Sequence, residues 1–94
     1  MAESSNRVII TVLGRDRVGI IARIATELAE CNINILDISQ TILQGFFTMM
    51  MVVDMAGAEV SLETLQERLK AAGEELGVQV TAQHEDVFRY MHRI

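Results

Sequence analysis

Apolar positions along the first third of the chain change from a strand pattern to a helix pattern. The β-branched run over residues 7–13 predicts a strand that is buried on at least one face. From residue 20 the spacing becomes helical, and it predicts a stripe made by Ile21, Ile24, Leu28 and Cys31. Asp16, in the loop between the two segments, is the expected N-cap of this helix.

The rest of the chain adds four more elements. Extended segments over 33–43 and 46–55 are joined by Gln44-Gly45, which predicts a hairpin. A second helix follows from a cap at Ser61, and Gly77 stands where its left-handed final residue belongs. Alternation over 78–83 predicts a last strand. The order is that of an α+β, ferredoxin-like βαββαβ fold, with two helices on one face of a four-stranded antiparallel sheet.

The length and composition indicate one small domain. Half of the 94 residues are hydrophobic, and the mean hydropathy is +0.27, so we expect some apolar surface to be buried against a partner. No apolar run reaches the roughly 20 residues of a membrane span, and the polar start of the chain is no signal peptide. We therefore expect a cytoplasmic protein without a membrane partner. Its parts are a flexible N-terminus over 1–6, a domain over 7–84 and a helical tail over 85–94 that packs at a dimer interface.

The charge balance argues against direct nucleic-acid binding. Thirteen acidic residues oppose eight basic ones, for a net charge of −5. Nucleic-acid binders need a basic face that neutralises phosphates. The basic residues gather only in two small clusters, one at Arg15 and Arg17 and the other at Arg89, His92 and Arg93. Each cluster suits a small anion rather than a polynucleotide.

No constellation in the sequence supports catalysis, a metal or a cofactor. Cys31 is the sole cysteine and falls on an apolar stripe, which predicts a core position. His84 and His92 are separated by eight residues, a spacing that fits no recognised metal site. No nucleophile stands beside a base. We expect neither catalytic residues, nor metal ligands, nor a cofactor.

The loop over 14–19 is the remaining candidate for chemistry. Its glycines allow a tight turn, the free amides at a helix start attract an anion, and Asp16 suits an ammonium group. Together these features suit a zwitterion. The alternative is purely structural: Gly14 ends a strand and Asp16 caps a helix, with nothing bound.

Four segments in order, over 14–21, 34–42, 47–54 and 85–94, resemble the ACT domain. The likeness covers the chain from Arg7 and is closest to stand-alone ACT proteins similar to the ACT domains of the glycine-cleavage-system transcriptional repressor. It implies a regulatory, non-enzymatic module that binds small molecules, usually amino acids, where two ACT domains meet. The implied ligand residues are Asp16, Val18, Gly19, Ile20 and Asn34. Val18 departs from the family pattern, in which many members have a proline.

The second strand of this topology is a sheet edge. Its stretch over 33–43 is long, apolar and free of proline and lysine, so it lacks the usual protection against pairing with another edge. We therefore expect a homodimer whose seam also forms the ligand site and which signals to a regulated partner protein. The alternative is an interaction module that acts on a partner without binding a ligand.

Overall fold

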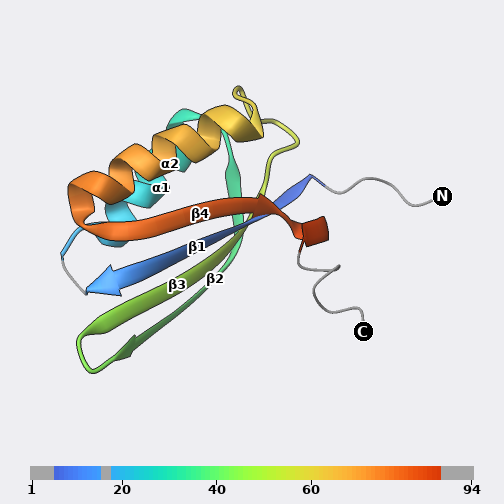
Figure 1. The fold of residues 1–94 in the computed structure, drawn as a ribbon. Helices are drawn as coiled ribbons and strands as arrows, with labels where there is room; N and C mark the ends of the chain where they lie inside the picture. The colour runs from blue at the N-terminus through green and yellow to red at the C-terminus, as the bar shows by residue number, and fades with distance from the viewer. Residues whose placement is uncertain (1–5, 16–17, 88–94) are drawn as a thin grey trace.

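The computed structural model describes residues 6–15 and 18–87, and six elements follow one another in the expected order (Figure 1). The α+β, ferredoxin-like prediction is confirmed. The elements are β1 (Arg7–Arg15), α1 (Ile20–Glu30), β2 (Asn34–Leu43), β3 (Phe46–Asp54), α2 (Leu62–Leu76) and β4 (Val78–His84).

The four strands form one antiparallel sheet in the order β2-β3-β1-β4. Ile10 in the middle of β1 lies between Met51 of β3 and Ala82 of β4. Both helices cover the same face of the sheet (Figure 1). The two edge strands are therefore β2 and β4, and β2 is the edge that the sequence predicted.

The core lies between the sheet and the helices. Every second residue of β1 and β3 points into it, and α1 and α2 add one stripe each, so that the most deeply buried side chains include Ile10, Val12, Met49, Met51, Ile24, Leu28, Leu65 and Leu69. Cys31 is buried at 1% exposure, which confirms its predicted core position. Ile24 and Leu28 of the predicted α1 stripe are buried as well, but its first member was wrong: Ile20 is buried, whereas Ile21 is 37% exposed. Ile20, Ile24 and Leu28 are spaced by four residues and therefore share the side of the helix that faces the sheet.

Of the three residues predicted to end a helix, one was wrong and two are confirmed. The N-cap of α1 is Gly19, with a left-handed φ of 96°, so the prediction of Asp16 as the cap is wrong. At α2, the Ser61 hydroxyl accepts a hydrogen bond from the Thr64 amide at 3.1 Å, as expected of a cap. Gly77 ends α2 with a φ of 76°, which confirms its predicted role.

The hairpin between β2 and β3 turns at Gln44 and Gly45, as predicted. Both residues have positive φ, 51° and 85°, which is the pattern of a type I′ turn. A bulge interrupts β2 between Ile35 and Asp37. From Leu36 onward every residue of β2 is exposed, so the strand is more open to solvent than its alternating pattern predicted.

The two ends of the chain are described only in part. Asn6 lies beside β3, where its carbonyl accepts a hydrogen bond from the Met55 amide at 2.9 Å. Residues 85–87 form a helical turn after β4. Residues 1–5 of the predicted flexible N-terminus (1–6) and residues 88–94 of the predicted tail (85–94) lie outside the described residues. Within the described part of the chain, neither helix is long and apolar enough to cross a membrane.

Candidate functional site

The start of α1 and the far end of β2 enclose a groove of about 260 Å³. Gly19 and Ile20, two of the predicted ligand residues, lie on its rim. Gln40 and Ile42 of β2 form the opposite wall, and the buried Phe47 lies between them. The groove therefore joins the predicted loop to the exposed edge strand.

Backbone amides at the start of α1 are available to a ligand in this groove. The first helical hydrogen bond runs from the Arg23 amide to the Gly19 carbonyl at 2.9 Å. No side chain caps this end of the helix among the described residues. The amides of residues 20–22 thus have no partner within the helix, and they lie at the positive end of its dipole. Such amides attract a carboxylate or another small anion.

The remaining predicted ligand residues do not join this groove within one chain. Asn34 opens β2, beside Asp54 of β3, whereas Ile42 lies near the other end of the strand. Eight residues of strand separate Asn34 from Ile42, or about 25 Å. Val18 is 96% exposed in the turn before α1, and Asp16 lies outside the described residues.

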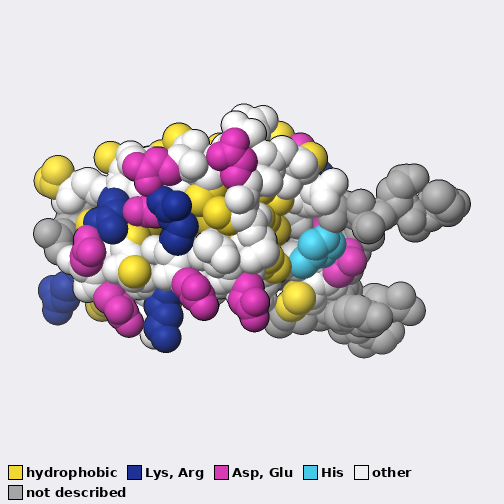
Figure 2. Space-filling view, turned by 90° about the horizontal axis from the view of Figure 1, so that it is seen from above, with side chains coloured by type: hydrophobic (Ala, Val, Ile, Leu, Met, Phe, Trp, Pro, Cys, Tyr) yellow, Lys and Arg dark blue, Asp and Glu magenta, His cyan; other side chains and the backbone are white. Residues whose placement is uncertain are grey.

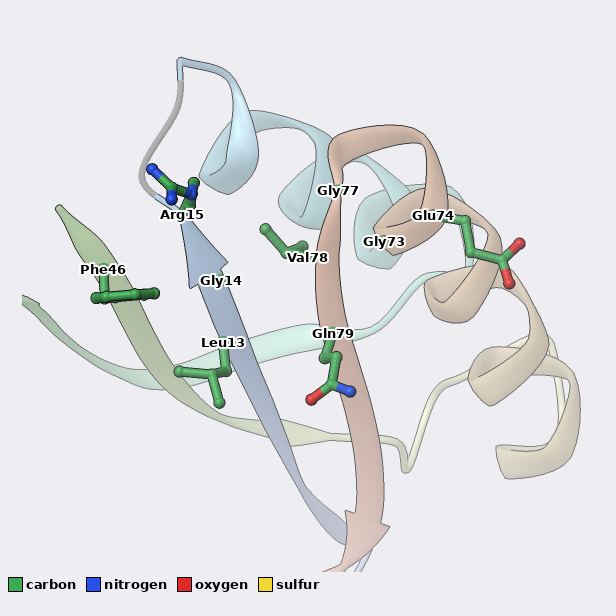
Figure 3. A pocket seen from close by; sticks show the side chains of 9 residues that line it. All are labelled: Leu13, Gly14, Arg15, Phe46, Gly73, Glu74, Gly77, Val78 and Gln79. Atoms are coloured by element: carbon green, nitrogen blue, oxygen red, sulfur yellow. The ribbon is translucent and has the colours of Figure 1, made fainter.

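A second, larger hollow of about 610 Å³ lies on the other side of the same loop (Figure 3). Arg15 stands at its edge, and Leu13, Phe46 and Val78 supply apolar surface. The carboxylate of Glu74 points away from Arg15 (Figure 3). Sequence reasoning missed this hollow because its wall comes from the ends of three strands and of α2. Only Arg15, noted as part of a basic cluster, pointed toward it.

The helical face carries interleaved positive and negative side chains (Figure 2). Arg68 of α2 donates to Glu27 of α1 at 2.8 Å and to Glu30 at 2.6 Å. Arg23 donates to Glu27 and also to Glu75. The hydrogen bonds that Arg23 donates to Glu75 and Glu27 raise the pKa of its guanidinium, which stays charged. Both guanidinium groups are paired with carboxylates, and these ion pairs link α1 to α2.

The acidic residues on the strands have structural partners. Asp37 accepts a hydrogen bond from the Ile38 amide, and Asp54 accepts one from the Ala56 amide, each at 2.9 Å. Within residues 6–15 and 18–87, no three histidine, cysteine, aspartate or glutamate side chains come close enough to hold a metal ion. The candidate site among the described residues is therefore the small groove beside β2, where the backbone amides at the start of α1 attract an anion.

Comparison with known proteins identifies the fold and its relatives. The family model for the ACT domain matches residues 6–83. A UPF0237 protein of Methanocaldococcus jannaschii is 58% identical, and the match covers 95% of this chain and 99% of that protein. The solved ACT domain protein from Streptococcus pneumoniae is 39% identical with a TM-score of 0.76, over 87% of this chain and 92% of that one.

A more distant structure shares the fold alone. It is a protein assigned as a glycine cleavage system transcriptional repressor, with 22% identity and a TM-score of 0.70. The match covers 82% of this chain and 44% of that chain. The sequence suggested a likeness to this class of protein, and the two structures share the same fold.

Proposed function

Because the chain belongs to the ACT domain family, whose members are regulatory domains, we propose that it is a non-catalytic, cytoplasmic homodimer that binds an amino acid. The observation that carries this proposal is the uncapped start of α1, which opens onto a groove walled by the free edge strand β2. A regulated partner protein would receive the signal.

The exposed edge of β2 is the proposed dimer contact. Leu36, Ile38, Ile42 and Leu43 are between 42% and 69% exposed along this strand. An edge of this kind pairs readily with another strand. In a two-fold dimer the same patch serves both copies, so the two β2 strands run antiparallel across the axis.

This pairing would complete the binding site. With the axis near Ile38, in the middle of β2, the start of one β2 lies beside the end of the other. Asn34 of the second copy would then approach the groove at Gly19 and Ile42. The 25 Å separation within one chain thus becomes a short distance between two chains. The site is incomplete in a monomer, which explains why its residues lie apart in one copy.

The chemistry of the groove suits a small α-amino acid. Its carboxylate would accept hydrogen bonds from the amides at the start of α1. The Asn34 side chain has both a carbonyl oxygen for an ammonium group and an amide for a carboxylate. Ile42 and Phe47 offer apolar surface to the ligand side chain. A groove of about 260 Å³ favours a small ligand.

A thermal-shift screen of the twenty amino acids tests the proposal. A ligand at a hundred times its Kd stabilises the native state by about 2.7 kcal/mol, which raises the Tm by on the order of 10 °C in a domain of this size. Ala22→Phe places a large side chain in the groove from an exposed helical position and should abolish the shift. Ala71→Phe, at an exposed position on α2, is the matched control and should retain it.

Two outcomes would count against the ligand site. Equal shifts in Ala22→Phe and Ala71→Phe would place the ligand elsewhere, with the hollow at Arg15 as the next region to test. No shift with any amino acid would favour the alternative function, an interaction module that regulates its partner without a ligand.

Sedimentation tests the dimer separately. Ile38→Lys brings two lysines together at the proposed axis, and like charges placed opposite each other are destabilising. The mass should fall to that of a monomer. Gln79→Lys puts the same charge on β4, the other edge strand, and should leave the dimer intact. A dimer that survives Ile38→Lys and dissociates in Gln79→Lys would overturn the proposed seam.

A further inference from the structure

In the described part of the chain, the face of the sheet opposite the helices carries six apolar side chains among polar ones. On β1 the core-facing residues are Val8, Ile10 and Val12, so the side chains between them point to the other face. Leu13 is 48% exposed there, and Met50 of β3 is 45% exposed. We call this surface the open face. Its apolar members are Ile9, Leu13, Leu43, Phe46, Met50 and Val52.

The centre of the open face carries no charge. Arg15 lies at one end of this face; at the other end Asp37 pairs with Val52, and Arg7 pairs with Asp54 one position further on. The other described residues of the face are the apolar ones above and uncharged polar side chains, namely Thr11, Ser39, Thr41, Thr48, Gln79, Thr81 and Gln83. Antiparallel sheets that face water normally alternate apolar-in with polar-out. On β3 the outward residues Phe46, Met50 and Val52 depart from that alternation. Exposed apolar side chains grouped in this way are candidates for burial against another segment.

The chain itself continues from the corner of this face. Residues 85–87 form a helical turn at the end of β4, clear of both helices (Figure 1). Gln83, just before this turn, is paired with Ile9, which in turn pairs with Val52. Seven residues follow Val87 in the sequence. The chain thus leaves β4 beside Ile9 and Val52 of the open face.

The sequence of this last segment is amphipathic at helical spacing. Val87, Phe88, Met91 and Ile94 fall on one side of a helix that continues the turn. Arg89 and Arg93 fall on the opposite side. Such a helix has one apolar stripe that needs a surface to pack against.

We propose that residues 85–94 form a helix that lies across the open face of their own sheet, with the apolar stripe on Ile9, Met50 and Val52. A ten-residue helix is about 15 Å long. Three strand spacings, from β4 to β2, amount to about 14 Å. The helix therefore spans the sheet, and its last residues reach the β2 edge. This placement also brings the end of the tail to the proposed dimer seam, although the inference does not depend on that seam or on a ligand.

Single-tryptophan variants of the full chain test this packing, since the natural sequence has no tryptophan. Phe88→Trp puts the reporter on the apolar stripe, and Arg89→Trp puts it on the opposite side of the same turn. In Phe88→Trp we expect blue-shifted emission and several-fold weaker quenching by acrylamide than in Arg89→Trp. Equal quenching in the two variants would overturn the proposal.

A second substitution tests whether the tryptophan at position 88 packs against the sheet. Adding Met50→Lys to Phe88→Trp places a charge in the centre of the open face at an already exposed position, so the fold should persist in far-UV circular dichroism. The quenching should then rise to the level of Arg89→Trp. Unchanged quenching would mean that the tail packs away from this face, which contradicts the proposal.

Measurements at different protein concentrations show whether the tail or a second copy of the chain covers the open face. If two open faces covered each other, the protection of the reporter would disappear when the protein is diluted to monomers. The proposed packing within one chain predicts protection that does not change on dilution and persists in the Ile38→Lys background. Loss of the protection from quenching both on dilution and in the Ile38→Lys background would overturn the proposed tail packing. A dimer that dissociates while the protection persists leaves the tail packing intact and bears only on the proposed function.

Discussion

Arg68 of α2 and Glu27 of α1 are joined by a hydrogen bond of 2.8 Å from Nε to Oε1. The second oxygen of Glu27 accepts from Arg23 at 3.1 Å, and the Glu27 side chain is only 13% exposed. Partial burial by itself raises the pKa of Glu27. The hydrogen bonds from Arg68 and Arg23 outweigh this effect, so the net pKa lies below the ordinary value of 4.5. The carboxylate therefore links the two helices as long as it is charged.

The stability of the domain should fall in acid through Glu27. Its folded pKa is lowered, so its contribution is complete above the unfolded pKa of 4.5 and is lost as the pH falls through the folded value. Glu27→Gln should cost about 1 kcal/mol at neutral pH, after allowing for solvent screening. The substitution should also make the free energy of unfolding fall less steeply as the pH drops below 4.5. Urea titrations over a pH series measure both effects.

Glu67→Gln is the matched control for this prediction, because Glu67 is an exposed residue on α2. It should leave both the stability at neutral pH and the acid slope close to those of the natural chain. If Glu67→Gln and Glu27→Gln changed the pH dependence of the free energy of unfolding equally, the link between the helices through Glu27 would not be the cause of the loss of stability in acid.

Gly73 should be intolerant of even a methyl group. A Cβ at this position would lie 2.7 Å from the carbonyl oxygen of Val78, a backbone atom that cannot rotate away. Overpacking costs about 1–3 kcal/mol, and alanine regains up to about 1 kcal/mol through helix propensity. We expect Gly73→Ala to lower the free energy of unfolding by about 1–2 kcal/mol. At Gly57 a Cβ would approach Asn32 no closer than 3.4 Å, so Gly57→Ala should be nearly neutral in the same denaturation experiment.

The β2–β3 hairpin should gain stability from a better turn residue. Gln44 has a φ of 51°, a conformation that asparagine adopts more readily than glutamine. Gln44→Asn should stabilise the domain by about 0.5 kcal/mol, or on the order of 2–4 °C in Tm. Gly45→Ala should instead cost about 1 kcal/mol because its φ is 85°. A lower Tm for Gln44→Asn in calorimetry would show that the glutamine makes a contact worth more than the turn preference.

Cys31 should react with thiol reagents only when the domain opens. Its side chain is buried at 1% exposure beneath the core residues. A thiol in such a place is protected from solution. Modification by a disulfide reagent should therefore be slow in buffer and fast in denaturant. Cys31→Ser buries a hydroxyl group and should cost about 1–3 kcal/mol, whereas immediate labelling of the native protein would contradict the buried placement.

Local signals account for the parts of the fold that the sequence predicted correctly. The Ser61 cap, the Gly77 end and the Gln44-Gly45 turn each depend on a few neighbouring residues, and each is confirmed. The errors come from a place where local rules compete. Both Ile20 and Ile21 are apolar, and Asp16 and Gly19 are both acceptable before a helix, so the first buried residue of α1 and its cap were misplaced, whereas Ile24, Leu28 and Cys31 were predicted correctly.

The amino-acid sequence by itself determined the element order, most of the buried stripe of α1 and the unprotected edge of β2, because spacing and side-chain chemistry are properties of neighbouring residues. Only the tertiary structure decided that Ile42 rather than Asn34 lies beside Gly19 within one chain. It also decided that Ile9, Met50 and Val52 share the face of the sheet that α1 and α2 do not cover. Both facts depend on which strands pair and in what register, and that choice is made by packing the whole chain around one core.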